Sequence, residues 1–261
     1  MGRNANTTSQ SKGALLITGA AKRVGRALAI ALAADGYDIH LHYRGSKDAA
    51  EDTAYAIAKH KRQVVLHQAD LADEQDCERL IADCLNDEAL VGIINNASVF
   101  TYDSNDDFKA SGFNRHMAVN AIAPAILMRD LAASMQSRQQ KAAVINITDA
   151  KLVGLNPDYY TYTVSKMALD GLTKMAAQAY APWLRVNAIA PGITLRSGDQ
   201  TDEEYRIAHA FNPLRQGAEC DDIIRLAKMI LDTPSMTGHT IVIDGGLHLR
   251  PPNRDVAFLD Q

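Results

Sequence analysis

The fold of this chain is decided by the stretch Leu15-Leu16-Ile17-Thr18-Gly19-Ala20-Ala21-Lys22-Arg23-Val24-Gly25. A continuous apolar run of strand length ends at Gly19, and a helix-period segment follows it directly. A glycine-bounded turn of this kind points free backbone N–H groups, and the positive end of a helix dipole, at an anion. Gly19 permits the tight turn, and Gly25 lets the helix pack closely on the strand. The stretch therefore predicts a strand–helix unit with a phosphate site at its turn.

Arg23 stands where the common dinucleotide-binding fingerprint has another glycine. This exchange places a guanidinium beside the predicted pyrophosphate, where it can clamp phosphate or reach a second ligand. The alternative is a glycine-bounded turn with two solvated basic residues, Lys22 and Arg23. The strand before the turn, the helix after it and the motifs downstream favour the cofactor site.

Apolar runs of strand length alternate with helix-period segments from residue 14 to residue 243, as is typical of strands buried on both faces of a parallel sheet. The predicted strands are Ala14–Thr18, Asp38–Tyr43, Gln63–Gln68, Val91–Asn95, Ala142–Thr148, Arg185–Ala190 and Thr240–Ile243. The predicted helices are Val24–Asp35, Asp48–His60, Glu74–Asn86, Phe113–Arg138, Tyr160–Tyr180 and Glu219–Asp232. This alternation predicts an α/β fold of Rossmann type: a doubly wound, seven-stranded parallel sheet with helices on both faces.

The length of 261 residues suits one large domain, which we predict over residues 13–250 between a disordered leader (1–12) and a C-terminal tail (251–261). The formal net charge of -4 argues against a nucleic-acid partner, because such proteins usually carry a basic face. No apolar run reaches membrane-span length, and the polar N-terminus lacks the apolar core of a signal peptide. Cys77, Cys84 and Cys220 make no disulfide framework, so we expect a reduced, cytoplasmic protein.

The end of the second predicted strand selects between NAD and NADP. It reads His42-Tyr43-Arg44-Gly45-Ser46, without the acidic residue that would hold a ribose 2′-hydroxyl and repel a 2′-phosphate. Arg44 can pair with phosphate bidentately, and Ser46 adds a hydroxyl, so we predict NADP(H) as the cofactor. His40 and His42 face the same side of this strand, but the sequence offers no evident third metal ligand. We therefore expect structural roles for both histidines and no metal site.

Two further strand ends complete the predicted cofactor site. Asp70-Leu71 follows the third strand, where the carboxylate can accept from the adenine amino group while the leucine covers the ring. The alternative for Asp70 is a cap on the helix that follows. Asn95-Asn96-Ala97-Ser98 ends the fourth strand, at the point where a bound cofactor crosses the sheet. The small side chain of Ala97 lets the backbone approach the ribose.

A Tyr-x-x-x-Lys pair marks the predicted catalytic centre. Tyr162 and Lys166 are one helical turn apart, so their side chains share a face. A tyrosine with a pKa of about 10 is a poor acid at neutral pH, and we expect the nearby ammonium to lower that pKa. The phenol can then deliver a proton as hydride arrives from a nicotinamide, whose ribose the lysine can hold. Asn120, in the long predicted helix, could hold a water that passes protons to Lys166; the alternative is a buried asparagine bonded to backbone, and both roles could hold together.

Asp149 narrows the expected substrate. It lies thirteen residues before Tyr162, at the end of a predicted strand. A plain ketone needs a neutral hydroxyl there, whereas a nitrogen heterocycle rich in N–H donors can use an acid that accepts hydrogen bonds and relays a proton. The carboxylate therefore favours a pterin-like ring. The alternative is that Asp149 is an ion-pair partner of Lys151 or Lys166.

Taken together, these residues resemble the short-chain dehydrogenase/reductase family over nearly the whole chain, from Leu15 to Asp244-Gly245-Gly246. Within that family the chain is similar to the pteridine reductases, which have an arginine at the place of Arg23 and an aspartate at that of Asp149. It is also similar to the bacterial dihydromonapterin reductases. The resemblance implies NADPH-dependent reduction, at a C=N bond, of a dihydropterin that is dihydrobiopterin-, dihydromonapterin- or dihydrofolate-like. It also implies a homotetramer.

The resemblance implies roles at the matching positions. Phe100 would stack the pterin against the nicotinamide, and Ser98 would bond both the cofactor phosphate and the pterin. The implied catalytic residues are Asp149, Tyr162, Lys166 and Asn120. The implied substrate-binding residues are Arg23, Ser98, Phe100, Asp149 and Tyr162. The predicted cofactor-binding residues, taken together, are Gly19, Arg23, Val24, Gly25, Tyr43, Arg44, Ser46, Asp70, Leu71, Asn96, Ala97, Ser98, Tyr162, Lys166, Pro191, Gly192 and Thr194.

Two other functions stay open. An ordinary carbonyl or 3-oxoacyl-thioester reductase would have serine or threonine at position 149, and Thr148 could take that role. A non-catalytic NADP sensor would have lost Tyr162 or Lys166, and neither is lost.

Two segments beside the site carry weaker signals. An acidic break, Asp199–Glu204, follows Pro191-Gly192, and Thr201-x-x-Glu204 predicts a capping box that starts a short helix, suited to a lid. The tail either reaches a neighbouring subunit's pocket or hangs free.

Overall fold

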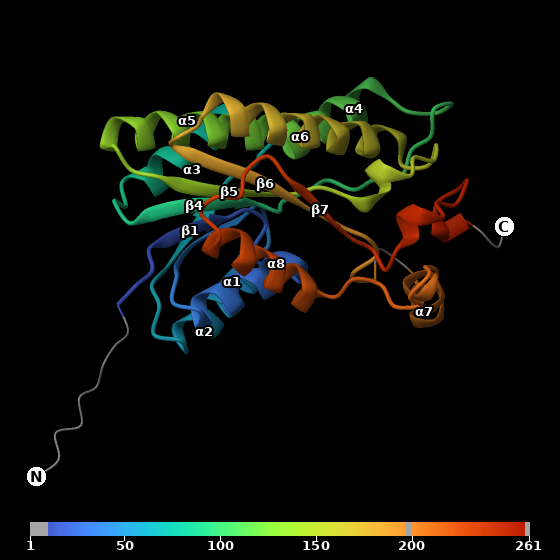
Figure 1. Cartoon of the computed structure of the whole chain (residues 1–261), viewed down its shortest axis with the longest axis horizontal. Helices are drawn as coiled ribbons and strands as arrows, with labels where there is room; N and C mark the ends of the chain where they lie inside the picture. The colour runs from blue at the N-terminus through green and yellow to red at the C-terminus, as the bar shows by residue number, and fades with distance from the viewer. Residues whose placement is uncertain (1–9, 197–199, 259–261) are drawn as a thin grey trace, which may run out of the picture.

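The computed structural model describes residues 10–196 and 200–258, which fold around one sheet of seven parallel strands (Figure 1). The strand order is β3-β2-β1-β4-β5-β6-β7, so the direction of winding reverses between β1 and β4. The bounds are β1 (Ala14–Ile17), β2 (Asp38–Tyr43), β3 (Val64–Gln68), β4 (Leu90–Asn95), β5 (Ala142–Ile147), β6 (Leu184–Pro191) and β7 (Thr240–Ile243). The predicted doubly wound sheet is confirmed, and each strand end lies within one residue of its prediction.

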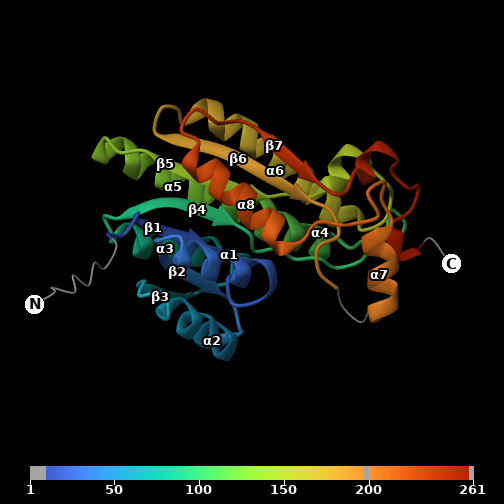
Figure 2. The same cartoon turned by 60° about the horizontal axis from the view of Figure 1, so that its bottom comes forward.

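Helices cover both faces of the sheet (Figures 1 and 2). One face carries α1 (Arg23–Ala34), α2 (Lys47–Ala58) and α8 (Cys220–Asp232). The other carries α3 (Glu74–Leu85), α4 (Ala110–Met117), α5 (Ala123–Arg138) and α6 (Tyr160–Ala179). A shorter helix, α7 (Asp202–Ala210), lies beyond the carboxyl ends of the strands.

Each face of the sheet has its own apolar core, because successive strand side chains point to opposite sides. In β1, Leu16 packs into the core beneath α3 and α5, whereas Leu15 and Ile17 pack into the core beneath α1 and α8. All three side chains are fully buried, and each such burial stabilises the fold by about 1.5–3 kcal/mol. The sheet is therefore a firm platform, and it fixes the strand ends from which the site residues project.

The predicted continuous helix Phe113–Arg138 is wrong. The structure has α4, then a π-helical turn, η1 (Ala118–Ile122), and then α5. Pro124 lies in the first turn of α5. It has no N–H to donate to the carbonyl of Asn120 four residues before it, and its ring crowds that carbonyl, so the preceding turn widens.

The predicted capping box before α7 is confirmed. The hydroxyl of Thr201 accepts from the backbone N–H of Glu204 at 3.2 Å, and the Glu204 carboxylate accepts from the backbone N–H of Thr201 at 2.6 Å. Asp199, the first residue of the predicted acidic break, lies outside the described residues. The cap fixes where α7 begins, next to the segment that follows β6.

Both ends of the described chain lie against the domain. The backbone N–H of Lys12 donates to the Gly36 carbonyl at 3.0 Å, one residue before the predicted domain start, while residues 1–9 of the predicted leader lie outside the described residues. The tail turns back through η3 (Leu247–Leu249), and η4 (Val256–Phe258) packs against α7 of the same chain. The described tail therefore fits neither predicted alternative; residues 259–261 lie outside the description. No helix in the described ranges has the length and apolar character needed to cross a membrane.

Candidate active site

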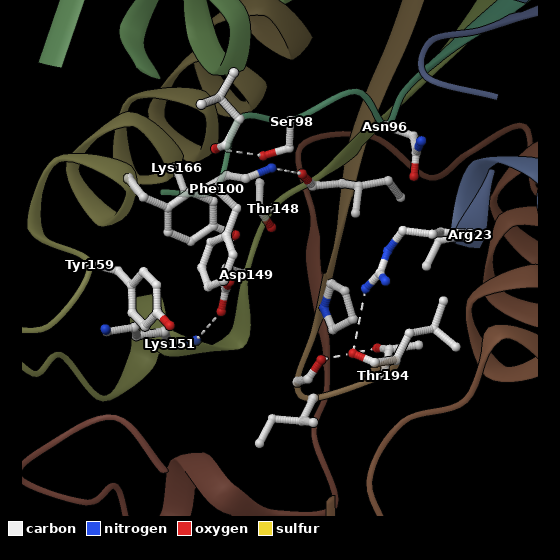
Figure 3. A pocket seen from close by; sticks show the side chains of 18 of the residues that line it. Arg23, Asn96, Ser98, Phe100, Thr148, Asp149, Lys151, Tyr159, Lys166 and Thr194 are labelled. Atoms are coloured by element: carbon white, nitrogen blue, oxygen red, sulfur yellow. Dashed lines mark hydrogen bonds between the residues drawn. The ribbon is translucent and has the colours of Figure 1, made fainter. Parts of the chain in front are cut away.

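A cavity of about 1710 Å³ opens at the carboxyl ends of the strands (Figure 3). All the residues predicted to bind cofactor or substrate lie on its wall, from the turn after β1 to Thr194 beyond β6. Asp149, Tyr162 and Lys166 lie there too, whereas Asn120 is fully buried behind the wall. Segments far apart in the sequence thus meet at one place, as the sheet's switch point predicts.

The turn after β1 is held by Thr18, Asn96 and His42. The Thr18 hydroxyl accepts from the backbone N–H groups of Asn96 and Ala97, each at 3.0 Å, and the Asn96 side chain donates to the Thr18 carbonyl at 2.9 Å. The backbone N–H of Gly19 donates to Nδ1 of His42 at 3.0 Å. These bonds lock the turn to the ends of β2 and β4. Sequence reasoning missed Thr18 and His42 in this role, although both lie at strand ends.

The two glycines of the turn are needed for close packing. Gly19 has a φ of +65, in the left-handed region that favours glycine. A Cβ on Gly25 would lie 2.3 Å from the Gly19 carbonyl oxygen and 2.6 Å from the Asn96 side-chain nitrogen. Lys22 precedes α1 without a side-chain cap, so the first N–H groups of the helix face the cavity. The turn has the shape and the donors that a pyrophosphate needs.

Arg23 crosses the cavity. Its φ is 56, and its guanidinium donates to the Arg196 carbonyl at 2.7 Å, on the segment after β6 (Figure 3). In Figure 3 it faces Phe100, Asp149 and Lys166 from the opposite side. Arg23 therefore ties the glycine-rich turn to the segment that follows β6.

The end of β2 forms a basic rim. Arg44 is exposed, and Ser46 precedes α2 with no side-chain cap. Lys22, Ser46 and Lys47 also line a smaller hollow of about 450 Å³, whose wall includes Asp48. Arg44, Lys22 and Lys47 give the rim the positive charge that a 2′-phosphate requires.

The Asp70 side chain stabilises the turn after β3 and also lines the cavity. Its carboxylate accepts from the backbone N–H of Ala72 at 3.1 Å and lies 3.5 Å from the Arg115 guanidinium. The cap of α3 is Asp73, whose side chain accepts from the Asp76 N–H. Asp70 is therefore a turn residue rather than the helix cap offered as the alternative, and it still faces the cavity.

His40 and His42 have separate hydrogen-bond partners. Nε2 of His42 lies 3.1 Å from the Ala69 carbonyl, and burial lowers the pKa of its ring, which keeps it neutral. His40 Nδ1 lies 2.9 Å from Nε2 of His67, and its Nε2 lies 3.1 Å from Asp87. Cys84 completes a group of three potential ligand atoms with His40 and His67. The hydrogen bonds account for both histidines structurally; the expectation of no metal stays a prediction.

The predicted catalytic residues meet at Asp149. The phenol of Tyr162 donates to one carboxylate oxygen of Asp149 at 2.7 Å, and the other oxygen accepts from the Lys151 backbone N–H at 2.9 Å. Lys166 donates to the Ile147 carbonyl at 2.7 Å and lies 5.8 Å from the Tyr162 ring centroid. The ammonium groups of Lys151 and Lys166 thus have other partners, and the ion-pair alternative for Asp149 does not describe the arrangement.

Burial is the main cause of the pKa shifts of Tyr162 and Lys166. Burial raises the pKa of Tyr162 well above 10, and the adjacent Asp149 carboxylate raises it further. Burial lowers the pKa of Lys166 to about 8, against the smaller opposing effect of Asp149. The predicted lowering of the tyrosine pKa by Lys166 is therefore wrong. Tyr162 is a neutral phenol, which suits a proton donor.

Asn120 belongs to the support behind the site. It lies in η1, where its side-chain oxygen accepts from the Val99 N–H at 2.8 Å and its nitrogen donates to the Val99 carbonyl at 3.0 Å. The same nitrogen donates to the Ser165 hydroxyl at 2.9 Å. These contacts match the alternative of a buried asparagine bonded to backbone. They fix the segment that leads to Phe100.

Phe100 presents an aromatic face at the cavity, being 46% exposed. It stacks on Tyr159 with ring centroids 4.3 Å apart and meets Tyr162 edge-on at 4.7 Å. Ser98 donates to the Val99 carbonyl at 3.2 Å. Thr148 is buried and donates to the Ile189 carbonyl at 3.2 Å, so its hydroxyl does not take the place of a serine beside Tyr162.

The wall also contains residues to which the sequence assigned no site role. Tyr159 and Lys151 line it next to Asp149, and Asp255 and Phe258 line it from the tail. The charged pair Arg254-Asp255 followed by apolar Val256–Phe258 was an available signal, because an amphipathic end suits packing against a domain. It could not show which surface the tail covers.

Comparison with known proteins agrees with this geometry. A family model described as Enoyl-(Acyl carrier protein) reductase matches residues 19–248. The chain is 30% identical to pteridine reductase 1 of Leishmania tarentolae over 288 aligned residues. The matched region covers 93% of this chain and 99% of that protein. It is 28% identical over 244 residues to 3-oxoacyl-[acyl-carrier-protein] reductase FabG of Staphylococcus epidermidis, with coverage of 90% and 98%. A solved structure of FolM alternative dihydrofolate reductase 1 from Brucella suis, in complex with NADP, is similar with a TM-score of 0.87 and 34% identity, covering 94% of this chain and 98% of that one.

Proposed function

Because the chain belongs to the short-chain dehydrogenase/reductase family and uses NADP(H), we propose that it reduces a dihydropterin to the tetrahydro form. The observation that carries the proposal is the 2.7 Å hydrogen bond between Tyr162 and Asp149. A carboxylate in contact with the proton-donating phenol suits a nitrogen-rich ring, which offers N–H donors and needs a proton at nitrogen. The named relatives that act on pteridine and dihydrofolate add support.

The residues present fit the cofactor. The Gly19–Gly25 turn leaves no room for a Cβ at Gly25 and offers uncapped N–H groups to the pyrophosphate. Arg44 and Ser46 would hold the 2′-phosphate at the basic rim. Lys166, whose ammonium is buried beside the Tyr162 ring, would hold the nicotinamide ribose. When bound, NADPH supplies the hydride that adds to the carbon of the substrate's C=N bond.

The proton follows a short path through the chain's own residues. As the carbon accepts hydride, the electron pair of the C=N bond moves to nitrogen, which takes the proton of the Tyr162 phenol. The phenolate that remains takes up a proton from solvent through the open cavity, and the restored phenol donates again to the Asp149 carboxylate at 2.7 Å. Phe100 would hold the flat ring by its exposed face, with Ser98 and Arg23 at its polar edges.

The proposal includes a homotetrameric assembly, which the resemblance implies, and a cytoplasmic location, which the cysteine content and the polar N-terminus favour. Both are open to direct measurement in the native cell and on the purified protein.

A second candidate is the reduction of a 3-oxoacyl thioester, favoured by the FabG relatives. The buried Thr148 hydroxyl, which bonds Ile189 instead of Tyr162, speaks against it. The test is NADPH oxidation by the purified chain with dihydrobiopterin, dihydromonapterin or an acetoacetyl thioester. We expect turnover on a dihydropterin. Turnover confined to the thioester would overturn the proposal.

A further inference from the structure

The tail segment, which we define as Pro251–Phe258, forms part of the cavity wall in the same chain. It is the red end of the ribbon beside α7 (Figures 1 and 2). Phe258 lies with its ring centroid 5.1 Å from that of Tyr102 and 6.2 Å from that of Tyr159, the residue that stacks on Phe100. The tail segment thus extends the aromatic group on which a flat substrate would rest.

A buried carboxylate pins the tail segment in place. The Asp158 side chain is 3% exposed and accepts two bonds of 2.8 Å from the Arg254 guanidinium, one on each oxygen. It also accepts from the Asp255 backbone N–H at 2.7 Å. The bidentate pair, together with the bond to the Asp255 N–H, fixes the backbone from which Asp255 projects.

The carboxylate of Asp255 faces the cavity with few partners. One oxygen accepts from the Ala257 N–H at 3.1 Å, and the other lies 3.7 Å from the Lys151 ammonium, beyond normal hydrogen-bond range. The Lys151 ammonium itself donates to the Asp158 carbonyl. Burial raises the pKa of Asp255, and the charge of nearby Asp149 raises it further. The Asp255 side chain is 23% exposed, and a carboxylate shielded this far from water is stabilised by a ligand that donates a hydrogen bond to it.

The carboxylate of Asp149 has less acceptor capacity left for a ligand than that of Asp255. Each of its oxygens already accepts one hydrogen bond, from the Tyr162 phenol and the Lys151 N–H. A ring whose edge carries two adjacent N–H donors pairs best with a carboxylate that can offer both oxygens. Asp255 has one oxygen that accepts only from the Ala257 N–H and a second with no contact shorter than 3.7 Å to Lys151, so it keeps more acceptor capacity for such an edge than Asp149.

We infer that Asp255 is a substrate-binding residue that selects flat heterocycles with an amino-pyrimidine edge, and that Arg254 and Asp158 are its positioning residues. The inference rests on the proposed function, which it deepens by assigning the recognition of the donor edge to the tail segment. It also gives the tail segment a role within its own subunit.

The test combines one enzyme change with one substrate change. Wild type and Asp255→Asn are assayed with a dihydropterin and with its analogue lacking the 2-amino group, while NADPH affinity is followed by fluorescence. We expect Asp255→Asn to raise KM for the dihydropterin about tenfold, as for loss of a charge-assisted hydrogen bond, with NADPH affinity unchanged. For the wild type the analogue should have a comparably raised KM; for Asp255→Asn the two substrates should differ little. The matched control is Asp106→Asn, an exposed carboxylate outside the cavity.

The outcomes separate the two levels of the proposal. If the wild type reduces a dihydropterin and Asp255→Asn discriminates between the two substrates as strongly as the wild type does, the role of Asp255 is overturned. The proposed function then still stands. Wild type that reduces no dihydropterin would overturn both. If circular dichroism shows that Asp255→Asn is not folded, Arg254→Ala is tested in its place, because the Arg254 side chain is half-exposed. It should then show the same loss of discrimination between the two substrates.

Discussion

The Tyr162 side chain lies almost fully buried in the cavity wall, where its phenol donates a hydrogen bond to Asp149. The sequence could predict this pair because residue spacing on a helix and at a strand end is enough to bring them together. It could not predict the direction of the tyrosine pKa shift, which depends on how deeply the ring is buried. Nor could it predict that the Thr148 hydroxyl turns toward Ile189.

Replacing Tyr162 with phenylalanine should abolish proton delivery while keeping the ring. We expect kcat to fall by ~10²–10⁴-fold, the usual contribution of a general acid, while NADPH affinity stays within about threefold. Single-turnover kinetics and fluorescence titration measure the two quantities. Equal losses in kcat and in cofactor affinity would mean that the phenol binds rather than reacts.

The Lys166 ammonium should impose a pH limit. Its pKa of about 8 means that the charge is present below pH 8 and is lost as the pH rises through that value. We expect kcat/KM to fall on the alkaline side with a midpoint near 8. Because the Asp149 charge raises this pKa, Asp149→Asn should move the midpoint to lower pH. Asp106→Asn should leave it in place; a midpoint that Asp149→Asn leaves unchanged would contradict the assignment to Lys166.

Among the elements, the strands were predicted to within a residue because continuous apolar runs can be buried on both faces only inside a parallel sheet. The π-helical turn η1 was missed. Its cause, Pro124, is visible in the sequence, but a proline in the first turn of a helix fits equally well with a fresh helix start. The tail was missed for a different reason, since its partner Asp158 is distant in sequence and its pairing depends on the tertiary fold.

The strand–turn–helix element makes a sharp prediction about its glycines. In Gly25→Ala the new methyl would lie 2.3 Å from the Gly19 carbonyl oxygen, so the turn must shift, and we expect NADPH affinity to fall by ~10²-fold or more. The matched control is Gly171→Ala, where a Cβ meets nothing within 4 Å inside helix α6. That change should leave NADPH affinity intact and raise the free energy of unfolding by about 0.5–1 kcal/mol. Equal NADPH affinity in Gly25→Ala and Gly171→Ala would contradict the proposal that the Gly19–Gly25 turn holds the pyrophosphate of the cofactor.

In the whole molecule, one cavity gathers residues from the first strand turn to the tail, and the sheet makes that possible by aligning the carboxyl ends of its strands. The cofactor half of the cavity follows from local motifs and was predicted residue by residue. The substrate half depends on the tail segment and on Tyr159 and Lys151, which no local pattern assigns. Substrate choice is thus the property of this chain that most needs the folded structure.

The most direct measurement is the ratio of kcat/KM for a dihydropterin to that for an acetoacetyl thioester, in wild type and in Asp149→Ser. The account predicts that the wild type prefers the dihydropterin. The serine variant, with a neutral hydroxyl beside Tyr162, should shift the ratio toward the thioester by about tenfold or more, the equivalent of one charge-assisted hydrogen bond. A ratio that is the same in both proteins would contradict the claim that the Asp149 carboxylate selects the substrate.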